Sequence, residues 1–107
     1  MTLTDEQRSK LDRAQEILGY RFGDESVLLS AITHPSATEG KSVKFSYERL
    51  EFLGDSILGA IVASTAFHRF HDLDEGGLTR IKVALVSGAS LADVAAGLGF
   101  ADVIVFG

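Results

Sequence analysis

The apolar residues of this chain follow a helical pattern almost from end to end. They return every three or four positions, which is the spacing that places side chains on one face of an α-helix. Residues 103–106 are the exception, because they form a short unbroken apolar run that resembles a strand. The pattern therefore predicts an all-α fold with helices at about residues 5–18, 24–33, 46–70, 78–87 and 91–98.

Signals for helix ends flank the first two predicted helices. Thr4 and Gln7 have the spacing of a capping box, and Gly19 is a typical stop signal. Asp24 is the expected N-cap of the second helix. Helical spacing assigns the buried faces to two sets of apolar residues: Leu11, Ala14, Ile17 and Leu18 in the first helix, and Val27, Leu28, Ala31 and Ile32 in the second.

The segments between and after the helices are expected to be irregular. Pro35 pushes His34 out of helical geometry, so residues 35–45 are predicted to form an exposed loop. The strand-like run at residues 103–106 has no evident partner strand, and no sheet is predicted. Because a compact domain seldom ends on bare apolar residues, we expect more protein to follow Gly107.

The third predicted helix carries the most informative polar pattern. At about 100° per residue, Glu48, Glu51 and Asp55 fall within roughly 60° of arc. Between residues 50 and 66 the only charged side chains are those of Glu51 and Asp55. A helix that is apolar nearly all round is typical of a protein interior, where ionised carboxylates are costly unless they are paired or bind a cation.

Two interpretations of these carboxylates are open. Carboxylates three or four residues apart on a helix lie about 5–6 Å apart at Cβ, so both can reach one hard cation. Mg²⁺ suits such a pair, because it binds one or two carboxylates and keeps several waters. The alternative is ion pairing with distant bases, for which the candidates are Arg69, Arg80 and Lys82.

Two glycines within the same helix indicate close packing against its backbone. Gly54 and Gly59 each cost about 1 kcal/mol of helix stability relative to Ala. We therefore expect another element to approach this helix closely at these positions.

Composition narrows the class of protein. The chain has 107 residues, of which 46% are hydrophobic, and this suits one small domain with its own core. A net charge of −5 is evidence against a passive nucleic-acid-binding protein, but it is compatible with an enzyme that contacts phosphates through metal ions. With no cysteine, no signal-peptide pattern and no apolar stretch of about 18 residues, we expect a cytoplasmic protein without a membrane span.

Several segments together resemble the ribonuclease III family. Residues 47–59, YERLEFLGDSILG, resemble the signature motif of that family. LGYRF at residues 18–22 resembles the turn after its first helix, and AITHPS at residues 31–36 resembles its threonine-histidine-x-serine segment. Residues 74–95 resemble the region before its second acidic motif, so the likeness covers nearly the whole chain.

This resemblance implies an all-α endonuclease domain that acts as a homodimer on double-stranded RNA, including ribosomal RNA precursors. Glu51 would be a ligand of the catalytic Mg²⁺, for which Mn²⁺ can substitute, and Asp55 would be the second catalytic carboxylate of the motif. Glu48 and Glu75 match acidic positions that line the RNA cleft, and Phe52 matches the aromatic residue that inserts into the partner subunit. The implied reaction is phosphodiester hydrolysis that leaves a 5′-phosphate and a 3′-hydroxyl.

The chain departs from the family pattern in its second half. The family site uses four carboxylates, two of them from an Asp-x-x-Glu helix that is absent here, and the usual double-stranded-RNA-binding domain is absent as well. Asp72 and Glu75 have the right spacing but align with a different family segment. Residues 1–107 are therefore expected to be a catalytic domain truncated before its last helices and inactive alone. The alternative is a non-catalytic RNA-binding or dimerisation module of the same fold.

The histidines and the loop lysines have simpler explanations. His68 and His71 have a spacing that allows a shared metal, but only His34 remains as a further histidine ligand. We therefore interpret them as solvated residues at a helix end, and we expect a structural role for His34. Lys41 and Lys44 fit either phosphate contacts or an ordinary solvated loop.

Overall fold

The computed structural model describes residues 2–107, and within them it confirms the all-α fold. The single β pairing in this part of the chain is an isolated parallel bridge between Thr33 and Val105. Short 3-10 turns at Pro35–Thr38, Val43–Phe45 and Phe100–Val103 connect the longer elements. The α-helices are α1 (Asp5–Leu18), α2 (Ser26–Ala31), α3 (Glu48–Arg69), α4 (Glu75–Val86) and α5 (Gly88–Leu98).

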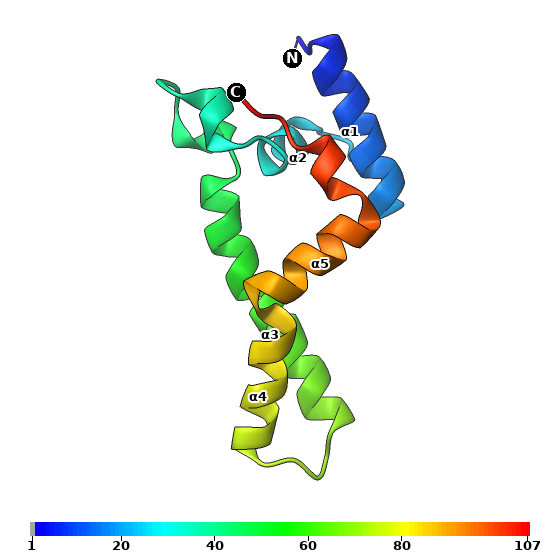
Figure 1. Ribbon diagram of the computed structural model, residues 1–107, viewed down its shortest axis with the longest axis vertical. Coiled ribbons are helices and arrows are strands. Elements are labelled where there is room, and N and C mark those ends of the chain that lie inside the picture. The colour runs from blue at the N-terminus through cyan, green and yellow to red at the C-terminus, as the bar shows by residue number, and fades with distance from the viewer. Residues whose placement is uncertain (1) are drawn as a thin grey trace.

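The helices spread out instead of forming one bundle (Figure 1). The two ends of the chain meet with α1 and α2 at one end of the molecule, and the α3–α4 hairpin projects from the other. The Cα radius of gyration is 16.4 Å, whereas a compact domain of this length has a radius of gyration of about 13 Å. Much of the apolar surface of the hairpin therefore has no neighbour within the chain.

Local capping explains where the helices begin and end. The capping box of α1 is confirmed, since the Gln7 N–H donates to the Thr4 hydroxyl at 3.1 Å and the Thr4 N–H donates to the Gln7 amide at 3.0 Å. Gly19 ends the helix with a left-handed φ of 66°, as predicted.

Three predicted helix starts were wrong: the cap of α2 was placed one residue too early, and the side-chain caps of α4 and α5 were missed. Asp24 accepts the Ser26 N–H at 2.9 Å, so α2 starts two residues later than expected and Asp24 is not its N-cap. Asp74 accepts the Gly77 N–H at 2.8 Å and starts α4 at Glu75. Ser87 accepts the Ser90 N–H at 3.1 Å and starts α5 at Gly88.

The buried core lies at the end where the chain termini meet. Its members come from α1, α2 and the C-terminal segment, and they are Leu11, Ala14, Leu28, Ile32, Val103 and Val105. The strand-like run at residues 103–106 does have a partner: the Val105 N–H donates to the Ile32 carbonyl and the His34 N–H donates to the Val105 carbonyl, each at 2.8 Å. The run is thus anchored and partly buried, which sequence pattern alone did not reveal.

Several apolar residues that were predicted to be buried are exposed. Leu18, Val27 and Ala31 lie outside the core, although helical spacing put them on the inner faces of α1 and α2. The reason is that α2 is a single short helix against α1, so it covers only a narrow stripe of apolar positions. Val94 on α5 is exposed as well.

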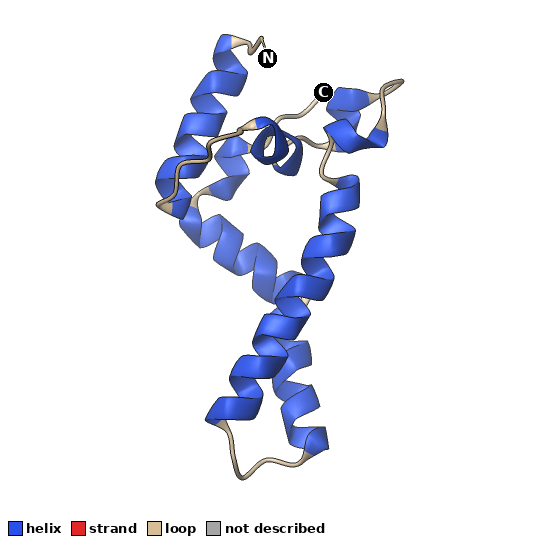
Figure 2. Ribbon diagram, turned by 180° about the vertical axis from the view of Figure 1, so that it is seen from behind, coloured by secondary structure: helices blue, strands red, loops and turns tan. Residues whose placement is uncertain are grey.

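The expectation that the central helix is buried was also wrong within this chain. Figure 2 shows α3 crossing α4 near its middle and standing apart from the other helices above that point. The apolar residues exposed along α3 include Phe52, Leu53, Ile57, Ile61 and Phe67. The expected close approach is confirmed at Gly59, where the aliphatic end of Lys82 lies 3.4 Å from the position a Cβ would take, whereas nothing lies within 4 Å of that position at Gly54.

By length and composition α3 would suit a membrane span, and α4 with α5, bent by 45°, pass the same test together. The expectation that no segment is long and apolar enough to cross a membrane was therefore wrong. The central helix of a water-soluble helical domain has the same composition. Asp55 lies a third of the way along α3, where a carboxylate is costly in hydrocarbon, and this opposes a span.

A polar network joins α1 to the turn before α2. Arg8 donates from Nη1 to Glu25 at 2.8 Å and from Nη2 to Asp12 at 2.7 Å. Gln15 is 2% exposed, donates to Glu25 at 2.7 Å and accepts the Phe22 N–H at 2.8 Å. The Arg8 hydrogen bonds lower the pKa of both Glu25 and Asp12 below their ordinary values.

This network predicts a loss of stability in acid that depends on Arg8. Because the pKa of each carboxyl is lower in the folded chain than in the unfolded chain, the unfolded chain takes up protons first as the pH falls. The stabilisation is complete at neutral pH and is lost below the ordinary carboxyl range. Arg8→Gln should lower the Tm near neutral pH and reduce the further fall in Tm on acidification, as measured by circular dichroism. Equal pH dependence in the two proteins would contradict this, and Arg13→Gln, which removes an exposed pair with Glu16, is the control.

A second prediction concerns the position of the core. Leu11 is fully buried, so Leu11→Ala should lower the free energy of unfolding by about 2–5 kcal/mol, measured by urea titration. Leu85→Ala makes the same chemical change at a half-exposed site on α4 and should cost less than about 1 kcal/mol. Similar costs for the two variants would show that the core lies elsewhere.

Candidate functional site

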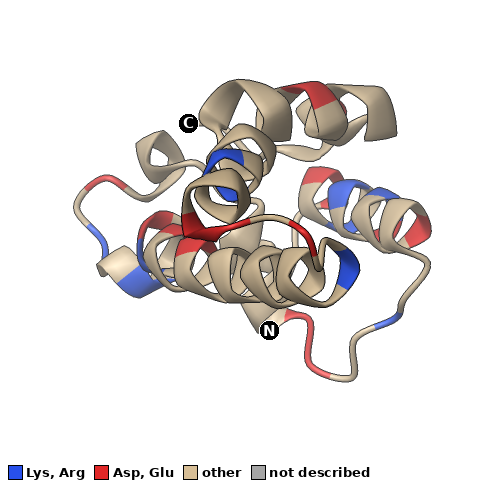
Figure 3. Cartoon of the chain, turned by 90° about the horizontal axis from the view of Figure 1, so that it is seen from below, with Lys and Arg blue, Asp and Glu red and all other residues tan. Residues whose placement is uncertain are grey.

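Three carboxylates lie in the first half of α3. Glu48 is the first residue of the helix, Glu51 lies in the same first turn, and Asp55 follows one turn after Glu51. Their i, i+3 and i+7 spacing puts them on one face of the helix, and all three are exposed. Figure 3 shows that charged residues occupy short bands along the chain, separated by long uncharged stretches.

Within residues 2–107, these carboxylates do not form the ion pairs with basic residues that the alternative interpretation requires. Across residues 2–107, no Lys, Arg or His nitrogen lies within 4.0 Å of the Glu48, Glu51 or Asp55 carboxylates. Instead, the ion pairs in the described chain gather on α1 and the turns beside it. The end of the Lys82 side chain lies against Gly59. Three like charges thus share one helix face without a protein counter-ion.

Helix electrostatics account for two of the three acids. Glu48 and Glu51 lie in the first turn, where the positive end of the helix dipole stabilises a carboxylate. Asp55 lies beyond the first turn, has a lower helix propensity and repels Glu51 four residues earlier. Its position is therefore not explained by helix stability, and a bound cation would relieve the repulsion.

Within residues 2–107 these acids are not buried. Glu51 and Asp55 were expected to face a low dielectric, but the helix around them is open to water. The desolvation cost that would demand a cation is absent here. What remains is uncompensated charge of one sign beside exposed apolar side chains.

Glu75 lies far from the other acids. It is the first residue of α4, at the tip of the hairpin, whereas Glu51 lies near the other end of α3 (Figures 1 and 2). α3 ends at Arg69 and α4 begins at Glu75 after a short turn, so both ends lie at the tip of the hairpin. Glu51 lies 18 residues before Arg69, which at a rise of 1.5 Å per residue puts it roughly 25 Å from that tip. Within one chain, Glu75 therefore does not join the acidic group.

Phe52 is the most exposed large apolar residue of the described chain, at 80%. It lines a hollow of about 660 Å³ between the start of α3 and α2, together with Glu48, Arg49 and Lys44. A phenylalanine that is so exposed beside two carboxylates indicates contact with another molecule or segment.

The donor set on α3 fits a hard divalent cation. Two carboxylates four residues apart, free of basic partners, match the one or two protein ligands that Mg²⁺ usually takes. Among the described residues, no group of three or more His, Cys, Asp or Glu side chains is placed to hold one ion. The described residues therefore supply part of an ion's coordination sphere, and the remaining positions would be filled by water or by other groups.

His34 has the structural role expected for it, and His68 contacts its own helix. His34 accepts the Ser36 N–H at Nδ1 over 3.0 Å and caps the turn at Pro35–Thr38, and its ring contacts Tyr47 and Phe106. His68 Nδ1 lies 2.7 Å from the Ser64 carbonyl oxygen in its own helix. Neither belongs to a metal-binding group within the described residues.

Comparisons with known proteins agree on one family. The family model described as Ribonuclease-III-like matches residues 24–107. Ribonuclease 3 of Rhodopirellula baltica is 46% identical over 99 residues, which cover 92% of this chain and 36% of that protein. Ribonuclease 3 of Symbiobacterium thermophilum is 47% identical over 92 residues, which cover 86% of this chain and 39% of that protein.

Solved structures give the same result. The nuclease domain of ribonuclease III from Campylobacter jejuni, for which structural flexibility is described in a region involved in dimer formation, superposes with a TM-score of 0.82 at 35% identity. The match covers 91% of this chain and 65% of that one. A second structure of that domain gives a TM-score of 0.78. The chain thus spans less than two thirds of these relatives, and less than two fifths of the curated ones.

Proposed function

The chain belongs to the ribonuclease III family and has the fold of its nuclease domain, and on this premise we propose that it forms part of an Mg²⁺-dependent endonuclease for double-stranded RNA. The observation that carries the proposal is the pair Glu51 and Asp55. These carboxylates share one face of α3, lack basic partners, and stand within the segment that resembles the family signature. Asp55 in particular has no structural role that explains it.

Glu51 and Asp55 would hold the ion. When bound, Mg²⁺ or Mn²⁺ supplies charge neutralisation at a phosphoryl oxygen and favours ionisation of water, which is the chemistry that phosphodiester hydrolysis needs. The rigid helix fixes the spacing of the two carboxylates, and the Glu51 N–H donates to the Tyr47 carbonyl at 2.7 Å, which secures the first turn. The products would carry a 5′-phosphate and a 3′-hydroxyl.

Glu48 and Glu75 are proposed to line the RNA cleft. The distance between them in one chain means that Glu75 would serve a different part of the cleft, or that of a partner subunit, rather than the ion bound at Glu51. Acidic residues repel phosphate, as does a chain with a net charge of −5. Glu48 and Glu75 would therefore meet the RNA backbone through bound cations.

A homodimer is proposed on the basis of Phe52. The exposed apolar residues along α3 are more than a water-soluble monomer normally leaves uncovered. The Campylobacter jejuni nuclease domain has a described dimer-forming region. We propose that Phe52 inserts into a second copy of the chain, and that the enzyme works in the cytoplasm.

Residues 1–107 alone are proposed to be inactive, because the described acids supply only two of the four carboxylates that the family site uses. The alternative, a non-catalytic RNA-binding or dimerisation module, predicts no need for Asp55. The two proposals differ in whether Asp55 matters to metal binding and to cleavage.

The metal site is testable on the chain itself. Mn²⁺ should broaden the NMR amide signals of residues around Glu51 and Asp55, and Asp55→Asn or Glu51→Gln should weaken this effect. Asp93→Asn, which removes an exposed acid from α5, should leave the broadening unchanged. Equal broadening in all variants would remove the two residues from the site.

Cleavage needs the rest of the domain, so it is tested in a chimera. Residues 1–107 would replace the matched segment of the Symbiobacterium thermophilum relative. This chimera should cleave double-stranded RNA with Mg²⁺, and Asp55→Asn should slow cleavage by about 100-fold or more, because several kcal/mol of charge stabilisation depend on the ion. Unchanged cleavage by the variant would favour the non-catalytic alternative.

The dimer makes a separate prediction. Phe52→Asp should weaken self-association by roughly 30-fold or more, measured as the dependence of sedimentation on concentration, because a central aromatic residue contributes much of the affinity of an interface. Phe67→Asp, a change at a similarly exposed phenylalanine near the other end of α3, is the matched control. If both variants weakened association equally, the effect would be a general reduction of apolar surface and not the removal of one specific interaction.

A further inference from the structure

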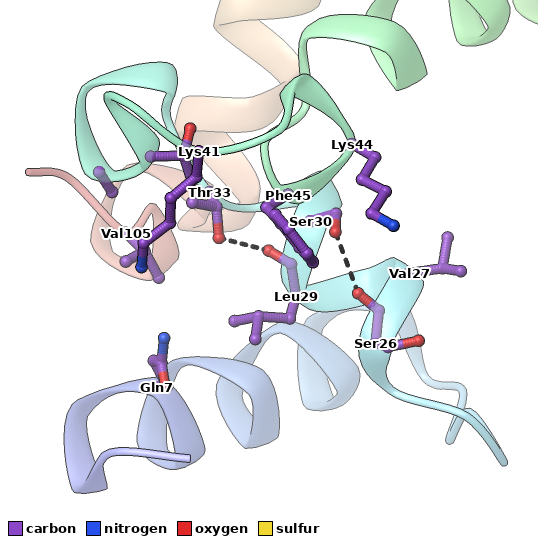
Figure 4. Close-up of a pocket in the computed structure, with 12 residues that line it drawn as sticks. Gln7, Ser26, Val27, Leu29, Ser30, Thr33, Lys41, Lys44, Phe45 and Val105 are labelled. Atoms are coloured by element: carbon purple, nitrogen blue, oxygen red, sulfur yellow. Dashed lines mark hydrogen bonds between the residues drawn. The ribbon is translucent and has the colours of Figure 1, made fainter. Parts of the chain in front are cut away.

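A second hollow lies on the side of α2 that faces α1 and the loop before α3. Its volume is about 460 Å³, within the roughly 300–1,000 Å³ typical of small-ligand sites. Figure 4 shows Phe45 pointing into the hollow from the loop, Gln7 pointing in from α1, and Lys41 and Lys44 on either side of Phe45. Of these residues, only Lys44 also lines the hollow beside Glu48 and Phe52.

The charge of this hollow is opposite to that of the chain. Acidic residues outnumber basic residues by 15 to 10, yet the lining contains two lysines and no Asp or Glu. Within residues 2–107, neither lysine forms an ion pair with a carboxylate. An anion is the ligand that such a setting favours.

The rest of the lining favours a ligand in which an apolar or aromatic group is attached to the anionic group. Phe45 is 51% exposed, and Leu29, Ala37 and Val105 lie around it. The hydroxyls of Ser30 and Thr33 already donate to backbone carbonyls of α2, as the dashed lines in Figure 4 mark. The lysines are therefore the main donors left for a ligand.

We propose that this hollow binds one unpaired nucleotide of single-stranded RNA. The base would stack on Phe45, and its flanking phosphates would lie against Lys41 and Lys44. Lys44 Nζ is 5.2 Å from the centroid of the Phe45 ring, so a cation stands next to the stacking surface. An aromatic face flanked by lysines is how proteins hold single strands without reading their sequence.

The position of the hollow supports this assignment. Val27, Ser30 and Lys44 line both this hollow and the larger one that contains Glu48 and Phe52, so the two hollows adjoin. A strand seated on Phe45 would therefore lead toward the start of α3 and its carboxylates. The inference rests on the proposed action on RNA and adds to it a site for unpaired nucleotides beside the duplex.

Binding is testable with the 107-residue chain in EDTA, which prevents cleavage. A fluorescently labelled oligouridylate should bind, as measured by anisotropy, and the Lys41→Gln, Lys44→Gln double variant should bind more weakly. The slope of log affinity against log salt should fall by up to about 1.4, at about 0.7 for each phosphate that the variant no longer neutralises. Phe45→Leu should reduce affinity roughly 5- to 100-fold, because one base can no longer stack on an aromatic ring.

Controls separate the site from general effects. Arg13→Gln removes a positive charge outside the hollow, and Tyr20→Leu removes an exposed ring on the turn after α1, so neither should change binding. NMR shifts caused by the oligonucleotide should centre on lining residues such as Leu29 and Ala37. These shifts test the site even if a variant fails to fold.

Three outcomes would overturn the proposal. The first is oligouridylate affinity that the lysine and Phe45 variants leave unchanged. The second is uridine monophosphate binding as tightly as the oligonucleotide, which would assign the hollow to a free nucleotide. The third is decanoate displacing the oligonucleotide from the same residues with higher affinity, which would assign it to an aliphatic carboxylate. Because no ion or cleavage is involved, these results are independent of the Asp55 experiments.

Discussion

The meeting of the two ends of the chain holds the rest of the structure in place. Val103 and Val105 are buried with Leu11 and Leu28, and backbone hydrogen bonds tie Val105 to Ile32 and His34. The Lys10 ammonium adds a bond to the Ile104 carbonyl at 2.7 Å. Without these contacts, α1 and α2 would bury too little apolar surface to offset the entropy of ordering them. The short C-terminal segment is thus part of the core.

The pairing of the C-terminal segment with residues 32–34 also sets the position of α3. The Tyr47 N–H donates to the Thr33 carbonyl at 3.0 Å, and Thr33 itself forms the bridge to Val105, so the start of α3 is held directly on the core. Glu48, Glu51 and Asp55 lie within the first turns after that anchor. The distal half of α3 packs mainly on α4. The carboxylates therefore lie close to the point where α3 is attached to the core, and the α4 contact lies further along the helix.

The sequence pattern predicted local features more accurately than it predicted which residues are buried. The capping box at Thr4, the stop at Gly19 and the close approach at Gly59 depend on neighbouring residues or on one contact, and each is confirmed. The exposure of Val27 and of the apolar face of α3 was not predictable, because an apolar stripe shows that a face needs covering but not what covers it. The acids of the candidate site were identified by their spacing. The hollow at Phe45 depends on residues from four separate segments, and of these the sequence singled out only Lys41 and Lys44 as candidates for phosphate contacts.

Under the proposed function, the separation of acidic and basic residues on the surface determines how RNA approaches this acidic chain. Phosphates are repelled by a chain with a net charge of −5 and by the unpaired carboxylates of α3. Near those carboxylates, the basic groups that line a hollow are Lys44 and Arg49, and Lys41 extends the positive surface away from them. Under the proposed function, a strand would be attracted first by these bases. The acids would become compatible with the backbone only once a divalent cation reversed the local charge. Affinity and catalysis would then reside in adjacent parts of one groove, with the ion deciding which phosphate reaches Glu51 and Asp55.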